Sequence, residues 1–240
     1  MAQSLHHSQI PGSASGHTYA NAIHIAGNNI YVAGRQSGSA KIWRNGVGQF
    51  VSGHAFWSVS NNVADIFVSG SNVYAVGTAV SNAGHRLPTL WRNGVAEHLC
   101  VVSRDFGARA IFISGNDVYI AGTMQNAEGV YVSTLWRNGV AQHLGVGIGR
   151  ADDVYVSSST VYVVGRDNDY ATLWRNGVAQ RLSNNISWAF GLFVLNDNVY
   201  IVGRERNAEG IDVATLWING VPQRLSNEQS NAGAVFVVYR

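Results

Sequence analysis

One eight-residue sequence recurs through the chain and restricts its fold more than any other feature. Thr-Leu-Trp-Arg-Asn-Gly-Val-Ala occurs unchanged at 89–96, 134–141 and 172–179, and variants of it occupy 41–48 and 215–222. The five tryptophans of these octets lie between 38 and 48 residues apart. Self-similarity at a fixed period of about 20–50 residues is the mark of repeat architectures. The chain therefore consists of five tandem copies of one unit.

Each unit contains four short segments with the composition of β-strands. The second segment is a Val/Ile-Tyr motif that ends in Gly, and a short apolar run forms the first segment. The octet supplies the third segment, and its Asn-Gly makes a two-residue turn into the fourth, because both turn positions need positive φ. No part of the chain has a convincing helical period. The five second segments are 30–34, 73–77, 118–122, 161–165 and 199–203.

The first two segments are apolar on both faces, which requires cover on both sides. A propeller meets this requirement, because each blade lies between two others. Four strands at this period predict an all-β, five-bladed β-propeller of four-stranded antiparallel blades. A solenoid would need polar capping units, and the terminal units are as apolar as the middle ones. We expect a single domain, 1–240, with repeats at approximately 22–60, 61–106, 107–149, 150–187 and 188–230.

Both ends of the sequence carry an additional strand-like segment. Residues 2–5 resemble the fourth strand of a unit, and residues 234–238 resemble the first. Together they exceed a five-bladed ring and fall two strands short of a six-bladed one. We expect five blades with one terminal segment redundant, displaced or exchanged with another chain, and the last case would give a homo-oligomer by terminal strand exchange.

The composition argues against several classes of partner. Net charge is +2, only 12% of the residues are charged, and the basic residues are dispersed, so no dense basic field for nucleic acid exists. No apolar run approaches the ~20 residues of a membrane helix, so we expect no membrane insertion. Cys100 is the only cysteine, which excludes an intrachain disulfide. Residues 1–16 lack a signal-peptide core. Localisation is left open: intracellular, or secreted if a leader has been removed.

The repeat resembles a group of bacterial β-propeller proteins that carry VYVAG…LWxNG repeats. The resemblance rests on 30–34 and 42–46 and their four later copies, and it covers nearly the whole chain. In architecture the chain is similar to the five-bladed tachylectin-type lectins, which bind amino sugars between blades. The resemblance implies the propeller fold, and it assigns no binding residue.

The sequence contains no complete catalytic motif. A metalloprotease His-Glu-x-x-His, a P-loop and a nucleophile elbow are all missing, so we expect no enzyme, no cofactor and no metal. A propeller glycosidase would need carboxylates that converge on the axis. The alternative, which we favour, is that they accept hydrogen bonds from backbone donors at the starts of strands. The candidates are Asp65, Asp105, Asp152 and Asp153.

The repeated tryptophans and arginines have two interpretations each. A tryptophan in every repeat could stack on sugar rings, but we expect packing between blades. The arginine before each Asn-Gly turn could bind anions, but we expect an exposed or cross-strand role. Ile218 replaces this arginine in the last repeat. The arginines are Arg44, Arg92, Arg137 and Arg175.

The loops between the second and third strands vary most. Those of the second, third and fifth repeats are long and share a core that ends in Gly, at 81–84, 126–129 and 207–210. Binding residues concentrate on such loops, and Asn and Glu suit sugar hydroxyls. The alternative is a duplicated turn in which Gly supplies positive φ. The predicted ligand-binding residues are Asn82, Asn126, Glu128, Asn207 and Glu209.

The near-identity of the octets indicates recent amplification of one blade, or engineering. Either origin favours several similar weak sites over one asymmetric catalytic site. We therefore expect a non-catalytic, lectin-like propeller whose partner is a carbohydrate or glycoprotein and which gains avidity from repeated sites. The alternative is a structural or protein-interaction scaffold without a small-molecule site.

Overall fold

The computed structural model describes residues 17–51, 61–81, 83–100 and 107–238. Within them, β-strands form five four-stranded antiparallel sheets, and in every sheet the strands follow chain order. We call these sheets blades 1 to 5. Blade 1 is β1 (Thr18–Ala26), β2 (Asn29–Gln36), β3 (Ser39–Arg44) and β4 (Val47–Phe50); blade 2 is β5 (Asn62–Ser69), β6 (Asn72–Val80), β7 (Arg86–Arg92) and β8 (Val95–His98); blade 3 is β9 (Ala108–Ser114), β10 (Asp117–Gln125), β11 (Tyr131–Arg137) and β12 (Val140–His143); blade 4 is β13 (Gly149–Ser157), β14 (Thr160–Asp167), β15 (Tyr170–Arg175) and β16 (Val178–Arg181); blade 5 is β17 (Ser187–Leu195), β18 (Asn198–Arg206), β19 (Asp212–Ile218) and β20 (Val221–Arg224).

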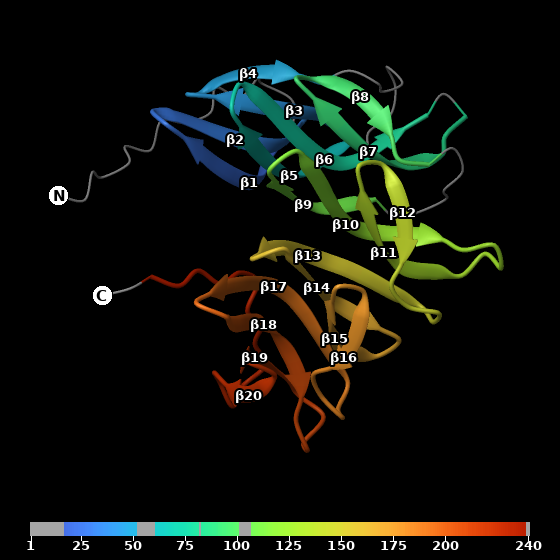
Figure 1. Ribbon diagram of the computed structural model, residues 1–240, viewed down its shortest axis with the longest axis vertical. Helices are drawn as coiled ribbons and strands as arrows, with labels where there is room; N and C mark the ends of the chain where they lie inside the picture. The colour runs from blue at the N-terminus through green and yellow to red at the C-terminus, as the bar shows by residue number, and fades with distance from the viewer. Residues whose placement is uncertain (1–16, 52–60, 82, 101–106, 239–240) are drawn as a thin grey trace.

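The five blades follow one another around an arc, with the first strand of each packed against the next blade (Figure 1). The prediction of an all-β propeller built from five four-stranded antiparallel blades is confirmed. No helix in the described part of the chain could cross a membrane.

The glycine that ends each second strand is explained by a β-bulge in the first strand. The register between these two strands shifts at the same place in every blade, for example between Ala151 and Asp153. The bulge brings the first strand's backbone close to the glycine, and a Cβ on Gly165 would overlap the carbonyl oxygen of Arg150. The five glycines are Gly34, Gly77, Gly122, Gly165 and Gly203.

The hydrophobic core is divided among the four interfaces between consecutive blades. Each interface has its own cluster of buried side chains, drawn from the two blades that meet there. The octet tryptophans are at most 3% exposed. The prediction that they pack between blades is therefore confirmed, and they cannot stack on a ligand. They are Trp43, Trp91, Trp136, Trp174 and Trp217.

The ends of the arc differ from its interior. Residues 2–5 lie outside the described part of the chain. Residues 234–238 lie beside β17, where the ring of Phe236 is 5.0 Å from that of Phe193. Among the described residues, blade 5 does not pack against blade 1 in the way that consecutive blades pack. The arc therefore remains open between its first and last blades (Figure 1).

Candidate functional site

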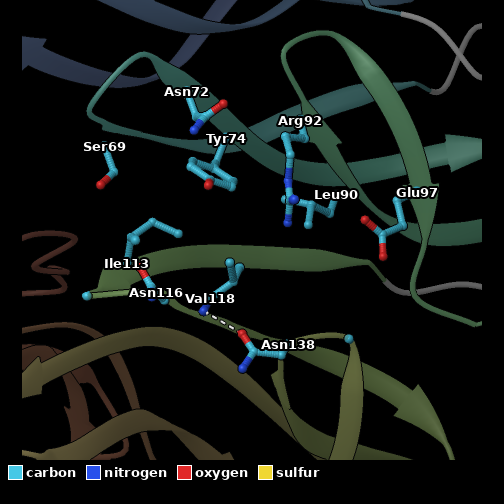
Figure 2. Close-up of a pocket in the computed structure, with 12 residues that line it drawn as sticks. Ser69, Asn72, Tyr74, Leu90, Arg92, Glu97, Ile113, Asn116, Val118 and Asn138 are labelled. Carbon is cyan, nitrogen blue, oxygen red and sulfur yellow. Dashed lines mark hydrogen bonds between the residues drawn. The ribbon is translucent and has the colours of Figure 1, made fainter.

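A cleft opens between consecutive blades on the side of the Asn-Gly turns. Between blades 2 and 3 it has a volume of about 270 Å³, and Figure 2 shows side chains of both blades facing each other across it. Between blades 1 and 2 a cleft of about 240 Å³ lies at the equivalent place. We call these the inter-blade clefts.

The two clefts are built from equivalent positions in the repeat. Each has a tyrosine from the second strand, an arginine from the end of the third, a Gln or Glu from the fourth, and the Asn-Gly turn of the next blade. In the cleft between blades 1 and 2 these are Tyr31, Arg44, Gln49, Asn93 and Gly94. In the cleft between blades 2 and 3 they are Tyr74, Arg92, Glu97, Asn138 and Gly139.

The same residue types recur at the other two interfaces. Blades 3 and 4 carry the tyrosine and the arginine as cross-strand partners, and the fourth strand of each holds a glutamine. The repeat thus places one set of aromatic, cationic and amide side chains at four successive interfaces. These residues are Tyr119, Arg137 and Gln142 with Asn176, and Tyr162, Arg175 and Gln180 with Asn219.

The asparagine of each Asn-Gly turn is fixed by the fold. Asn138 has φ of 52°, and its side-chain oxygen accepts a hydrogen bond from the backbone N–H of Val118 at 2.9 Å (Figure 2). Its amide nitrogen donates to the Asp117 carboxylate at 2.6 Å. Asn93 makes the same two contacts in blade 2, to Val73 and Asn72. These asparagines form a rigid wall of the cleft.

Each cleft arginine lies over the tyrosine opposite it on the second strand. The Arg–Tyr distances to the ring centroid lie between 5.2 and 5.6 Å in blades 1 to 4. The predicted cross-strand role of Arg44, Arg92, Arg137 and Arg175 is therefore confirmed. Such cation–π contacts hold the guanidinium at the mouth of the cleft with its N–H donors accessible.

The cleft between blades 2 and 3 differs from the others in charge. In blade 3, Arg137 donates to Asp117 at 2.7 Å, and this hydrogen bond holds the pKa of Asp117 below its usual value. In blade 2 the position of Asp117 is taken by Asn72, so Arg92 is not engaged by that carboxylate. Glu97 replaces the glutamine of the other clefts. This cleft therefore offers an aromatic ring, a cation and an acceptor carboxylate together (Figure 2).

The size and chemistry of the clefts limit what they can hold. Their volumes lie just below the range of about 300–1,000 Å³ that is typical of drug-sized ligand sites. Donors, acceptors and an aromatic ring in a small open crevice suit a group the size of one sugar ring with several hydroxyls. Among the described residues, no cluster of three or more His, Cys, Asp or Glu side chains could hold a metal ion.

The predicted loop residues lie on the opposite side of the blades and do not converge. Asn126 accepts hydrogen bonds from the backbone N–H groups of Glu128 and Val130, and Asn207 accepts the equivalent pair from Glu209 and Ile211. Their side-chain oxygens therefore hold the loop turn. Gly129 and Gly210 have φ of 78° and 80°, as the turn interpretation requires. Glu128 and Glu209 are exposed, and Asn82 lies outside the described part of the chain.

The candidate axial carboxylates join neighbouring blades. Asp65 accepts hydrogen bonds from the backbone N–H of Ile66 on its own strand and of Ile111 on the next blade. Asp153 does the same with Val154 and Leu192. The expected role as acceptors at strand starts is confirmed, and the bridge to the next blade is an addition to it.

Burial changes the acidity of these carboxylates. Desolvation raises the pKa of Asp65 to about 6 and that of Asp153 to about 7, and backbone hydrogen bonds oppose the change. Burial also raises the pKa of Asp152, against the pull of Arg109 at 2.7 Å and Arg150 at 2.9 Å. Asp105 lies outside the described residues.

The centre of the arc is occupied by aromatic rings. One ring from the first strand of each blade contacts the ring of the next, with centroids between 4.7 and 5.4 Å apart. A substrate at the axis would have to displace this packing, so the geometry favours the inter-blade clefts as the place for a ligand. The rings are His24, Phe67, Phe112, Tyr155, Phe193 and Phe236.

Sequence reasoning did not identify the tyrosines and the fourth-strand Gln/Glu as site residues. A signal was present: the Val/Ile-Tyr motif and the octet arginine recur with a constant register. In a hairpin this register makes them direct cross-strand neighbours, as Tyr74 and Arg92 are.

Comparison with known proteins shows the fold and nothing finer. The sequence matches no protein-family model and no curated protein. The putative TolB from Agrobacterium tumefaciens is 14% identical over 90% of this chain and 83% of its own, with a TM-score of 0.57. The nidogen/laminin complex gives 11% identity over 90% of this chain and 84% of its own, with a TM-score of 0.54. Both similarities are those of β-propellers.

Proposed function

We propose that this chain is a non-catalytic, lectin-like propeller that binds carbohydrate in its inter-blade clefts. One observation carries the proposal: clefts of nearly equal volume, with the same tyrosine, arginine and Asn-Gly wall, lie at two successive interfaces, and the same residue types recur at the next two. Repeated weak sites of this kind favour ligands displayed in many copies, because avidity then exceeds the affinity of one site.

The non-catalytic part of the proposal draws on the axial carboxylates. Both oxygens of Asp65 and of Asp153 are engaged by backbone donors. A glycosidase acid or base needs an oxygen directed at the substrate. The aromatic rings at the axis also oppose access by a sugar.

A glycan array with immobilised ligands tests the proposal. We expect weak, density-dependent binding by the wild-type protein. Arg92→Ala with Glu97→Gln should reduce the signal in part, because three clefts remain. Adding Arg44→Ala, Arg137→Ala and Arg175→Ala should remove most of it.

A matched control uses the loops on the other side of the blades. Glu128→Ala with Glu209→Ala should leave the array signal unchanged if the clefts are the sites. A loss of binding in this control would move the sites to the loop residues Asn126, Glu128, Asn207 and Glu209 instead. Absence of binding to any glycan at high ligand density would reject a lectin function and favour a scaffold.

A further inference from the structure

The exposed face of β1 is an apolar surface that every other blade covers. Ile23 and Ile25 are 60% and 65% exposed. At the position of Ile23, the other blades have side chains that are 3–5% exposed, and at the position of Ile25 they have side chains that are 4–8% exposed. In blades 2 to 5 the preceding blade buries these side chains. They are Ile66, Ile111, Val154 and Leu192 at the first position, and Val68, Ile113, Val156 and Val194 at the second.

The other end of the arc carries the first strand of a sixth blade. Ser230 N–H donates to the carbonyl oxygen of Asp212 at 3.0 Å, and the Ser230 hydroxyl oxygen accepts from Ala214 N–H at 2.9 Å. Ser187, which is 43 residues earlier, makes the same two bonds from the start of blade 5 to blade 4, at 2.9 Å each. Residues 226–238 therefore dock on blade 5 as residues 183–195 dock on blade 4.

The aromatic rings at the axis confirm this equivalence. Phe236 continues the series that begins at His24, at a distance typical of the other steps. The inner circle thus has six first strands, although the described residues form only five complete sheets. Phe236 and Val238 are 76% and 67% exposed on the side away from blade 5.

The sixth position lacks its second and third strands in the described part of the chain. Residues 231–238 pair with no strand there, whereas the equivalent β17 pairs with β18 along its length. Within the arc, the first strand of a blade packs against the first three strands of the blade before it, as β5 packs against β1, β2 and β3. Ile23 and Ile25 are therefore exposed because the strands that would cover them are missing from the sixth position.

We propose that the space between residues 231–238 and the exposed face of β1 is a docking slot for a β-hairpin supplied by another polypeptide. The first strand of the hairpin adds to the unpaired edge of 231–238, which is the β-augmentation mode of recognition. Its side chains cover Ile23 and Ile25, as the second and third strands of the other blades cover their equivalents. The partner sequence is consequently rich in β-branched and aromatic residues in its first strand and carries a Leu-Trp pair in its second.

Thiol reactivity at the slot tests this proposal. The full chain carries Cys100→Ser together with Ile23→Cys, and the probe is a synthetic hairpin with the sequence of residues 198–218, β18 to β19. The I23C thiol should react rapidly in the free protein and lose its reactivity saturably as the hairpin is added. A scrambled peptide should have no effect. The V47C thiol is the matched control, because Val47 is 77% exposed on the same blade but outside the slot, and it should stay reactive throughout.

Three outcomes would overturn the proposal. If the I23C thiol is unreactive in the free protein, the slot is already closed, by a second copy if light scattering gives a dimer and by ring closure if it gives a monomer. If the thiol stays reactive with the added hairpin and also with the same hairpin fused after Arg240, the slot does not accept this element. If only the fused hairpin protects, the face accepts a strand pair of its own chain and is no docking site for a partner.

Discussion

The two buried carboxylates that bridge neighbouring blades predict a distinctive dependence of stability on pH. Burial raises the pKa of Asp153 from 3.8 to about 7 and that of Asp65 from 3.8 to about 6. One pKa unit corresponds to about 1.4 kcal/mol, so ionised Asp153 costs the folded state about 4 kcal/mol relative to its protonated form, and Asp65 costs about 3 kcal/mol.

The sign follows from where protons are bound. Between pH 3.8 and about 7 the folded state holds a proton on Asp153 that the unfolded state has released. The free energy of unfolding therefore falls as pH rises through this window, and it levels off above pH 7. At low pH the protonated carboxyl is present in both states and the penalty disappears.

Asp153→Ala isolates this effect, because other titrating groups remain in both proteins. Alanine already occupies the equivalent place in blades 1 and 3, as Ala22 and Ala110, so the backbone tolerates it. Urea denaturation at pH 4.5 should show the variant to be less stable, since two backbone hydrogen bonds are lost. At pH 8 this deficit should shrink or reverse, with a total change of about 4 kcal/mol.

The control is Asp169→Ala, which removes an exposed carboxylate of the same blade and should show no such trend. If the stability difference between wild type and Asp153→Ala is the same at pH 4.5 and pH 8, the carboxylate is not held in a desolvated bridge and the reasoning fails.

Two further predictions concern the repeat itself. Trp136→Ala, at a side chain that is 0% exposed, should lower the free energy of unfolding by about 3–5 kcal/mol in urea denaturation, and a loss below 1 kcal/mol would contradict its placement between blades. Asn138→Ala should cost about 1–3 kcal/mol in melting experiments, because it loses the bond to Val118 and strains a left-handed turn, whereas Asn138→Gly should cost less; equal losses would show that φ is unimportant there.

The blades could be predicted because their signals are local and repeated. The Asn-Gly turns and the apolar second strands fix each hairpin without reference to the rest of the chain. Ring closure could not be predicted, because it depends on how one terminal strand is seated. Residues 234–238 were identified as a first strand, yet only the bonds of Ser230 to blade 5 show that they begin a sixth position.

The candidate site was harder to predict than the fold. Polar loop residues such as Asn126 attracted attention, but their side chains hold the turn. The clefts are formed where Tyr74 and Arg92 meet the Asn-Gly turn of the next blade, and contacts between repeats leave little trace in the sequence. The mixed role of Asp65 was anticipated in part: the bond to its own strand follows from position, while the bond to Ile111 requires knowledge of the neighbouring blade.

The number of ligands bound per chain tests the central claim most directly. Native mass spectrometry with increasing amounts of the strongest glycan from the array should show stepwise binding of several ligands to one chain. Arg92→Ala with Glu97→Gln should remove one of these steps and leave the others. A single ligand per chain, or a series that this double variant does not shorten, would contradict the assignment of repeated inter-blade clefts as the binding sites.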